Sequence, residues 1–260
     1  MVTLTLDRTG VALGRRAVVR DISAAFDADT LTGIVGPNGA GKSTLARAML
    51  ALVPATGTAR IDGDDVTALP RAELARRVAY LPQGQTLHWP LTVERLVGLG
   101  RLPHLAPMSR IADGDAAAIA RAMERADVLG LKDRIATELS GGERARALFA
   151  RALAAEAPAL IADEPLASLD PGHQIDVMEL LRAEADAGKL VIAVLHDLTM
   201  AARYCDRLLV IDRGTIFADG TPREVLTPDL LRAVYGIDAR IETGGDWPTV
   251  TTFGRAQSPD

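Results

Sequence analysis

The stretch GPNGAGKST, residues 36–44, fits the pattern G-x-x-x-x-G-K-[ST] at every fixed position. The apolar run LTGIVG at 31–36 precedes it and STLARAMLALV at 43–53 follows it. The loop therefore joins a predicted strand to a predicted helix, which we expect Pro54 and Gly57 to end. Glycines let successive backbone N–H groups point at phosphate oxygens, and the helix amino end adds partial positive charge. The stretch predicts a phosphate-binding loop, or P-loop, in an α/β fold.

Lys42, Ser43 and an acidic pair complete the predicted nucleotide site. Lys42 supplies a positive charge for the β- and γ-phosphates, and the Ser43 hydroxyl is expected to ligate Mg²⁺. A P-loop needs an acidic metal partner at the end of a neighbouring strand, and Asp163 follows the apolar run ALIA. We predict that Asp163 holds Mg²⁺ and that Glu164 acts on the attacking water as general base or orienter. The residues predicted to hold ATP are Gly36, Pro37, Asn38, Gly39, Ala40, Gly41, Lys42, Ser43 and Thr44.

The rest of the chain alternates strand-like and helix-like segments. ALIADEP at 159–165 and KLVIAVLHD at 189–197 are continuous apolar runs that end in polar residues, which is typical of parallel strands buried on both faces. RLLVIDRGTIFADG at 207–220 indicates a hairpin that turns at Arg213 and Gly214. The other predicted elements are strands at 2–6, 17–26, 57–63 and 77–83, helices at 91–99 (capped by Thr92), 115–129 and 142–157 (ended by Pro158), and helical turns at 221–236.

A second glycine loop, LSGGE at 139–143, shows which kind of P-loop protein this is. The motifs GPNGAGKST, LPQ at 81–83, LSGGE, LIADEP, SLD at 168–170 and His196 occur in the order seen in ABC-family ATP-binding cassettes. The chain resembles that family over about residues 1–235. The resemblance implies a P-loop NTPase (RecA-like) α/β core with a parallel central sheet, an antiparallel β subdomain and an inserted α-helical subdomain.

The same resemblance implies how the chain is divided. Residues 1–241 are expected to form a single ATP-binding cassette, with the core at 1–84 and 157–225 and the helical signature subdomain at 85–156. Residues 242–260 read as a turn-rich, peripheral tail.

In ABC cassettes the signature loop binds the γ-phosphate held by the P-loop of a second copy. Ser140, Gly141 and Gly142 would do so here, with a hydroxyl and exposed N–H groups at a helix N-terminus. Asp170, in SLD, is expected to cross to the opposite subunit and order its site. The resemblance therefore implies a head-to-tail dimer that holds two ATP molecules between its copies.

Two more residues are expected to act on the nucleotide by resemblance. Gln83 should reach Mg²⁺ or the attacking water, and His196 should contact the γ-phosphate and help to hold the transition state. The remaining histidines, His88, His104 and His173, have no matching ligand set and are interpreted as surface or packing residues.

The sequence departs from the family pattern at two positions. Glu143 stands where Gln is more usual, beyond the phosphate-facing residues, and is expected to be tolerated. Leu13 stands where an aromatic residue usually stacks on adenine, and the lost ring stacking is worth roughly 1 kcal/mol. We therefore expect weaker ATP affinity and looser base discrimination, with the phosphate and metal contacts complete.

Composition bounds the remaining possibilities. The net charge is −5, which argues against a nucleic-acid binder, because such proteins usually carry a basic surplus. The single cysteine, Cys205, excludes an internal disulfide framework. No stretch approaches the roughly 18 apolar residues needed to span a bilayer, and the N-terminus lacks the apolar run of a signal peptide. We expect a cytoplasmic protein that reaches a membrane only through a partner.

Three stretches resemble the ABC subgroup that drives bacterial uptake of ferric siderophores, haem and cobalamin: TVERLVGLGRLPH at 92–104, LDPGHQIDVMELL at 169–181 and GTPREVLTPDLLRAVYG at 220–236. The resemblance implies an ATPase at the cytoplasmic face of the inner membrane, beneath permease subunits and indirectly served by a substrate-binding protein. A groove near the Gln83 loop would take a permease helix. The adjoining segment contains His88, Trp89 and Pro90. Trp89 could contact the permease or could equally pack in the core.

Two alternatives stay open. The chain could serve an importer of another small solute or an exporter. It could instead be a soluble ABC ATPase that works on nucleic acid or ribosomes, although such proteins usually show tandem cassettes, a coiled-coil insertion or a basic surface.

Overall fold

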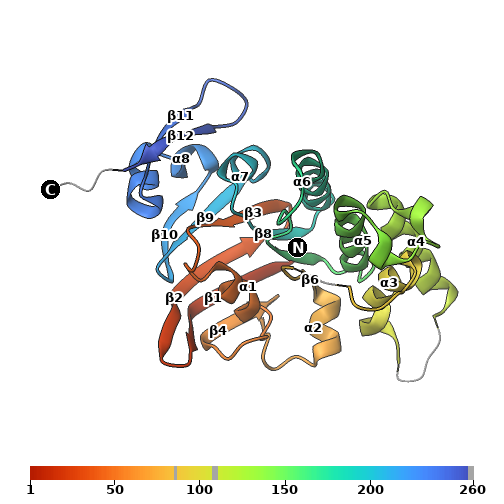
Figure 1. Cartoon of the computed structure of the whole chain (residues 1–260). Helices are drawn as coiled ribbons and strands as arrows, with labels where there is room; N and C mark the ends of the chain where they lie inside the picture. Colours follow the sequence, from red (N-terminus) through yellow and green to blue (C-terminus); the bar gives the residue numbers. More distant parts are fainter. Residues whose placement is uncertain (85–86, 107–110, 257–260) are drawn as a thin grey trace.

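The computed structural model describes residues 1–84, 87–106 and 111–256. Its centre is a six-stranded sheet in the order β10-β9-β3-β8-β7-β6, in which every neighbouring pair is parallel except β10–β9. Helices cover one face of this sheet, and a second sheet lies below the other (Figure 1). The strands are β3 (Thr30–Val35), β6 (Val78–Leu81), β7 (Ala159–Asp163), β8 (Leu190–Val194), β9 (Arg207–Asp212) and β10 (Thr215–Gly220).

The central strands are apolar throughout because the side chains of each one pack into two hydrophobic cores. Successive side chains of a strand point to opposite faces of the sheet. In β7, Leu160 and Ala162 pack under α6 (Pro171–Asp186) and α7 (Leu198–Tyr204), whereas Ile161 packs in the core that contains α1 (Lys42–Ala48). Every residue of β7 and β8 is buried. The predicted parallel sheet is therefore confirmed, with its buried strands where the apolar runs placed them.

The second sheet is antiparallel, as the family resemblance implied. Its order is β2-β1-β4-β5, with β1 (Thr3–Leu13), β2 (Arg16–Asp27), β4 (Thr56–Ile61) and β5 (Asp64–Asp65). Alternate side chains of β1 and β2, such as Leu4, Leu6, Ile22 and Phe26, are buried against α1. One face of the sheet thus closes the core, and the other face carries exposed residues.

The segment between β6 and β7 is helical in its described part. The helices are α3 (Val93–Gly98), η1 (Leu99–His104), α4 (Asp113–Arg125), η2 (Leu129–Leu131), η3 (Ala136–Glu138) and α5 (Gly141–Leu153), and α2 (Arg71–Arg77) precedes β6. Thr92 caps α3 as predicted, because its hydroxyl accepts the Arg95 N–H at 3.3 Å. Ion pairs Arg125–Glu184 and Arg146–Asp176 tie α4 and α5 to α6.

Three helices end earlier than the sequence predicts, and one of them, α4, ends at Arg125 instead of 129. Helix α1 ends at Ala48, before Pro54, because Ala51 takes a left-handed conformation (φ 49°). The Leu52 N–H then donates to Arg47 O at 2.9 Å and the Ala51 N–H to Ala48 O at 3.0 Å, which is the Schellman arrangement. Helix α5 likewise ends at Leu153, five residues before Pro158, and Glu156 is left-handed there (φ 51°). Prolines mark these ends without causing them.

The C-terminal segment is more ordered than a turn-rich tail. After α8 (Pro222–Val225), α9 (Pro228–Leu230) and a π-helical turn η4 (Leu231–Tyr235), strands β11 (Ile237–Glu242) and β12 (Thr249–Arg255) form a hairpin. The hairpin projects beside α7 and α8 (Figure 1). Its loop is held by Arg223, whose guanidinium donates to the carbonyls of Thr243, Gly245 and Asp246 at 2.7–3.0 Å. Trp247 stacks on Arg203, 4.8 Å from guanidinium carbon to ring centroid.

Arg223→Ala is expected to loosen this hairpin without weakening the core. Three charge-assisted hydrogen bonds would be lost, and losing even about 1.4 kcal/mol of local stability speeds opening about tenfold. Hydrogen exchange followed by mass spectrometry should show at least about tenfold faster exchange over 237–255 and an unchanged Tm. Arg255→Ala, an exposed change on the same hairpin, is the control. Unchanged exchange in Arg223→Ala would contradict the anchoring role.

Candidate active site

Four polar loops follow four neighbouring strands at one edge of the central sheet. The P-loop follows β3, His196 follows β8, Asp163 and Glu164 end β7, and Gln83 follows β6. The sheet order β3-β8-β7-β6 brings these loops together although they are up to 160 residues apart in sequence. Carboxyl ends of parallel strands share an edge, so this is the expected place for a ligand.

The P-loop backbone has the curvature that phosphate binding needs. Gly36, Gly39 and Gly41 all have positive φ (148°, 78° and 106°). At Gly36 no side chain could be accommodated, because a Cβ would lie 2.0 Å from the Ile211 carbonyl oxygen. The loop is also braced from outside, since the Gly214 N–H of the β9–β10 turn donates to Ala40 O at 3.0 Å. The predicted turn at Arg213 and Gly214 is confirmed (φ 47° and 83°).

Lys42 is folded back onto its own loop. Its ammonium is buried and donates to Gly36 O at 2.8 Å and Pro37 O at 3.1 Å. Burial lowers the pKa of Lys42, and the nearby carboxylates of Glu164 and Asp163 partly offset that effect. The charge is therefore available inside the loop, held by neutral carbonyl oxygens that phosphate oxygens can replace.

The two oxygens of the Glu164 carboxylate contact the other two predicted catalytic residues, Gln83 and His196. Gln83 Nε2 donates to Glu164 Oε2, and His196 Nε2 lies 2.7 Å from Glu164 Oε1. Glu164 itself is in the left-handed region (φ 53°), a strained conformation for a residue with a Cβ. Asp197, the residue after His196, caps α7 by accepting the Thr199 and Met200 N–H groups at 2.8 and 2.9 Å.

Asp163 is a fully buried carboxylate with one oxygen still open. Its Oδ2 accepts the Tyr80 hydroxyl at 3.1 Å and lies 3.9 Å from Arg47. Its Oδ1 is buried with no hydrogen-bond partner. Burial and the Asp163 charge raise the pKa of Tyr80, which keeps that hydroxyl a donor. An orphaned carboxylate oxygen beside a P-loop is what a divalent cation would occupy.

The described residues contain no cluster of three His, Cys, Asp or Glu side chains that could cage a metal. This fits Mg²⁺ in a nucleotide site, which takes one or two protein oxygens and completes its shell with phosphate oxygens and water. Ser43, directly after Lys42, and Asp163 supply oxygens of that kind.

The signature residues form a separate group at the start of α5. Ser140 is the N-cap: its hydroxyl accepts the Glu143 N–H at 3.3 Å, and the Glu143 carboxylate accepts the Ser140 N–H at 2.9 Å. The departure to Glu143 thus preserves a capping box. Gly141 is exposed, Gly142 is covered by His173, and Asp170 caps α6 beside them. Within one chain these residues hydrogen-bond among themselves.

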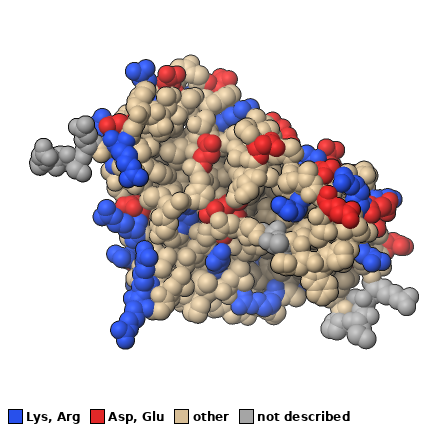
Figure 2. Space-filling view, in the orientation of Figure 1, with Lys and Arg blue, Asp and Glu red and all other residues tan. Residues whose placement is uncertain are grey.

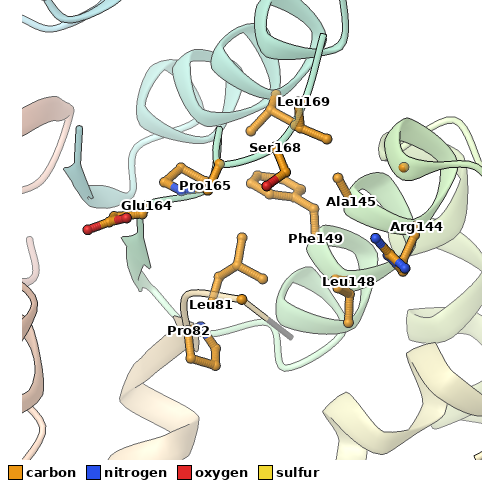
Figure 3. A pocket seen from close by; sticks show the side chains of 14 residues that line it. Leu81, Pro82, Arg144, Ala145, Leu148, Phe149, Glu164, Pro165, Ser168 and Leu169 are labelled. Carbon is orange, nitrogen blue, oxygen red and sulfur yellow. The ribbon is translucent and has the colours of Figure 1, made fainter. Parts of the chain in front are cut away.

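A cavity of about 250 Å³ separates this group from the Glu164 cluster. It lies between the loop after β6, the first turns of α5 and the segment after β7 (Figure 3). Phe149 and Ala145 border it from α5, and Ser168 and Leu169 border it from the segment after β7 (Figure 3). The Glu164 carboxylate is turned away from it (Figure 3). Its oxygens contact Gln83 and His196 instead.

A second cavity of about 320 Å³ adjoins the P-loop on the side of the antiparallel sheet. Its charged lining is Arg16, Arg20, Asp212 and Arg213, and P-loop residues 37–40 form the opposite side. Leu13 lies at the exposed end of β1 and is not among the lining residues. The described lining of this cavity has no aromatic side chain.

Two residues that contact Asp163 had no site role in the sequence analysis. Tyr80 and Arg47 contact Asp163, and both come from elements predicted as a strand and a helix without any site role. His173, interpreted as a surface or packing residue, packs over Gly142, and its Nδ1 lies 2.9 Å from Asp170 Oδ1. Its position three residues after the α6 N-cap was the available signal, because such residues face the cap.

The comparisons with known proteins agree with this geometry. The chain matches the ABC transporter family over residues 19–167. It is 47% identical to the cobalamin import ATP-binding protein BtuD of Halobacterium salinarum over 94% of this chain and 61% of that protein. It is 43% identical to the hemin import ATP-binding protein HmuV of Pseudomonas entomophila, over 91% of this chain and 94% of that protein. The chain thus spans less than two thirds of the first relative and nearly all of the second.

Among solved structures, the chain is similar to a metal-chelate type ABC transporter in an inward-facing conformation. The TM-score is 0.84 at 20% sequence identity, and the match covers 97% of both chains. At that identity the likeness concerns the fold, and it extends over almost the whole chain, the C-terminal segment included.

Lys42→Met is expected to stabilise the nucleotide-free protein at neutral pH. Because burial lowers the pKa of Lys42 below its ordinary 10.5, the charged form costs folding free energy below the folded pKa. That cost disappears as the pH rises through the folded pKa toward 10.5. The variant should therefore have a raised Tm at neutral pH, and the gain should shrink at alkaline pH.

The same variant should lose nucleotide binding. Two charge-assisted contacts to phosphate would be gone, so ATP affinity is expected to fall at least about 10²-fold and ATP should no longer raise Tm. Thermal melts with and without ATP between neutral and alkaline pH measure both effects. A lower Tm at neutral pH, or a full ATP-dependent shift, would refute the role assigned to the buried ammonium.

Proposed function

The chain belongs to the ABC transporter family, and from this premise we propose that it is the ATP-hydrolysing subunit of an importer of metal chelates, meaning ferric siderophores, haem or cobalamin. Two relatives support this substrate class, because one is named for cobalamin import and the other for hemin import, and each aligns with more than 90% of this chain. Both ligands hold a metal in a macrocycle. We assign the choice among chelates to the permease and its substrate-binding protein.

We base the proposal of ATP hydrolysis on the contacts that hold the Glu164 carboxylate. A carboxylate held by Gln83 and His196 beside the P-loop is oriented to take a proton from a water that attacks the γ-phosphate. We propose that ATP draws Lys42 from Gly36 O and Pro37 O onto the β- and γ-phosphates. The Ser43 hydroxyl, Asp163 Oδ1 and Gln83 would hold Mg²⁺, which neutralises charge on the phosphates when bound.

We propose that the site is completed by a second copy of the chain. Ser140, Gly141 and Gly142 lie at the amino end of α5, a capped helix of 13 residues. Such a helix end is suited to bind a triphosphate. In one chain these groups stand across the cavity from Glu164, so another molecule's ATP is their best ligand. The Asp170 side chain is 63% exposed and would reach the opposite subunit in the same contact. Two ATP molecules would then join a head-to-tail pair, and hydrolysis would release it.

We propose a membrane permease as the other partner, at the cytoplasmic face of the bacterial inner membrane. None of the helices in the described part of the chain is long and apolar enough to cross a bilayer. Trp89, which the sequence left open between core and partner contact, has 74% of its surface exposed. A large apolar side chain in water beside α3 favours the partner contact.

The surface supports transport over work on nucleic acid. Acidic and basic side chains are interspersed over the face in Figure 2, although basic side chains gather at the edge near β2. The face in Figure 2 does not carry the broad basic patch that a nucleic-acid partner needs, and the net charge of −5 gives no basic surplus.

Glu164→Gln is expected to stop hydrolysis and trap the dimer. The amide keeps the size of the side chain and removes the base, so phosphate release should fall at least about 10²-fold. An ATP-bound dimer should persist in analytical ultracentrifugation. Glu143→Gln is the matched control, because it makes the same change on the capping box and should alter turnover less than about twofold. Undiminished hydrolysis in Glu164→Gln would remove Glu164 from its role.

Trp89→Ala is expected to break the permease contact. Exposed aromatic anchors in interfaces typically cost more than about 2 kcal/mol when truncated, or about 30-fold in affinity. Affinity capture of the tagged chain from detergent-solubilised host membranes, read by mass spectrometry, should lose its polytopic membrane partner. Phe253→Ala removes another exposed aromatic side chain, 63% exposed on β12, and should retain it. Equal recovery by both variants would count against the proposed docking site.

A further inference from the structure

His173 lies at a junction between two motifs that the proposed dimer uses. It is the third residue of α6, three positions after Asp170, and its imidazole covers the buried backbone of Gly142. A Cβ placed on Gly142 would fall 1.2 Å from His173 Cδ2 and 1.8 Å from Nε2. The second glycine of the signature loop is therefore needed to admit this ring, whatever else it does.

The opposite edge of the ring is bound to Asp170. His173 Nδ1 lies 2.9 Å from Asp170 Oδ1, and the same oxygen accepts the His173 backbone N–H at 3.1 Å. These hydrogen bonds lower the pKa of Asp170, so its carboxylate stays charged. The side chain remains 63% exposed, which leaves it available to a second molecule.

The two ends of this contact belong to different parts of the fold. Gly142 lies in the first turn of α5 in the helical segment, and Asp170 is the N-cap of α6 on the central sheet. The cavity of about 250 Å³ lies between the same two regions, so they are not packed continuously there. Away from the ring, the ion pair Arg146–Asp176 at 3.4 Å also joins α5 to α6. The ring thus contacts the signature loop itself.

We propose that His173 is a positioning residue that locks the signature glycines and Asp170 into one rigid surface, which then meets the partner's triphosphate as a unit. The proposal rests on the proposed two-copy ATP site. Without the lock, the signature loop and Asp170 would each have to be ordered when the dimer closes, and that ordering would weaken ATP-driven dimerisation.

A space-filling role and a positioning role predict opposite rankings of two substitutions. His173→Phe keeps a flat ring over Gly142 and removes Nδ1. His173→Asn loses most of the ring and keeps an amide N–H near the Nδ1 position, where it can reach Asp170 Oδ1. If the hydrogen bond to Asp170 does the positioning, Asn should perform close to His and Phe should not. If only packing counts, Phe should perform close to His and Asn should not.

The experiment measures ATP-driven dimerisation in a Glu164→Gln background, where hydrolysis does not interfere. In sedimentation, the dimer dissociation constant of the His173→Phe variant should be at least about tenfold higher than that of the protein that keeps His173. The reason is that each copy of the symmetric dimer loses a charge-assisted hydrogen bond. His173→Asn should recover to within about threefold. Asp176→Ala breaks the Arg146 ion pair between the same two helices and should stay within about twofold.

Failure of the two-copy site and failure of the His173 proposal give different results. If the Glu164→Gln protein does not dimerise with ATP at all, the two-copy site is wrong. If it dimerises and His173→Phe dimerises equally well, the two-copy site stands and the positioning role of His173 is overturned. Binding of a fluorescent ATP analogue to the monomer should be the same in all variants, and a loss there in His173→Phe would also overturn the proposal.

Discussion

The order of the parallel strands is the constraint on which the site depends. In β3-β8-β7-β6, the loop that follows each strand lies beside the loop of the next strand, so the P-loop, His196, Glu164 and Gln83 form one continuous edge. Backbone bonding continues past the strand ends: the Leu195 N–H donates to Ile34 O at 3.0 Å, and the Glu164 N–H to Val194 O at 3.2 Å. A one-residue slip of register would turn these side chains to the wrong face. The fully buried strands prevent that slip, because both of their faces are packed.

That rigid edge sustains unfavourable local geometry where the chemistry needs it. Glu164 has a left-handed backbone, Asp163 keeps an unpartnered buried oxygen, and the Lys42 ammonium is held inside its loop. Each of these costs folding free energy, of the order of 1–3 kcal/mol for a strained or unpaired group. The large cores on both sides of the sheet offset the cost. ATP and Mg²⁺ would supply the missing partners, so the same features that weaken the empty site favour binding.

The sequence predicted where the strands lie better than it predicted the ends of the helices. Gln83, Glu164 and His196 lie together because they follow apolar runs that form neighbouring strands of one sheet, and their roles on the nucleotide stay predictions. Helix ends were missed because Ala51 and Glu156 take left-handed conformations that usually fall to glycine, and nothing local reveals them. The C-terminal hairpin was missed because its stability comes from distant residues, Arg203 and Arg223. The particular contact of His173 with Gly142 could not be predicted, because Gly142 is 31 positions away on another helix.

The central claim is that one triphosphate site is built from two copies of the chain, and complementation tests it most directly. Lys42→Met removes the phosphate anchor and Ser140→Arg blocks the signature loop, so each variant alone should be inactive. A mixed pair would contain one intact site, made from the P-loop of the Ser140→Arg copy and the signature loop of the Lys42→Met copy. Mixing the two inactive proteins should therefore restore ATP hydrolysis to a substantial fraction of the wild-type rate. A mixture that stays as inactive as its components, or a Ser140→Arg protein that hydrolyses ATP at the full rate, would contradict the shared site.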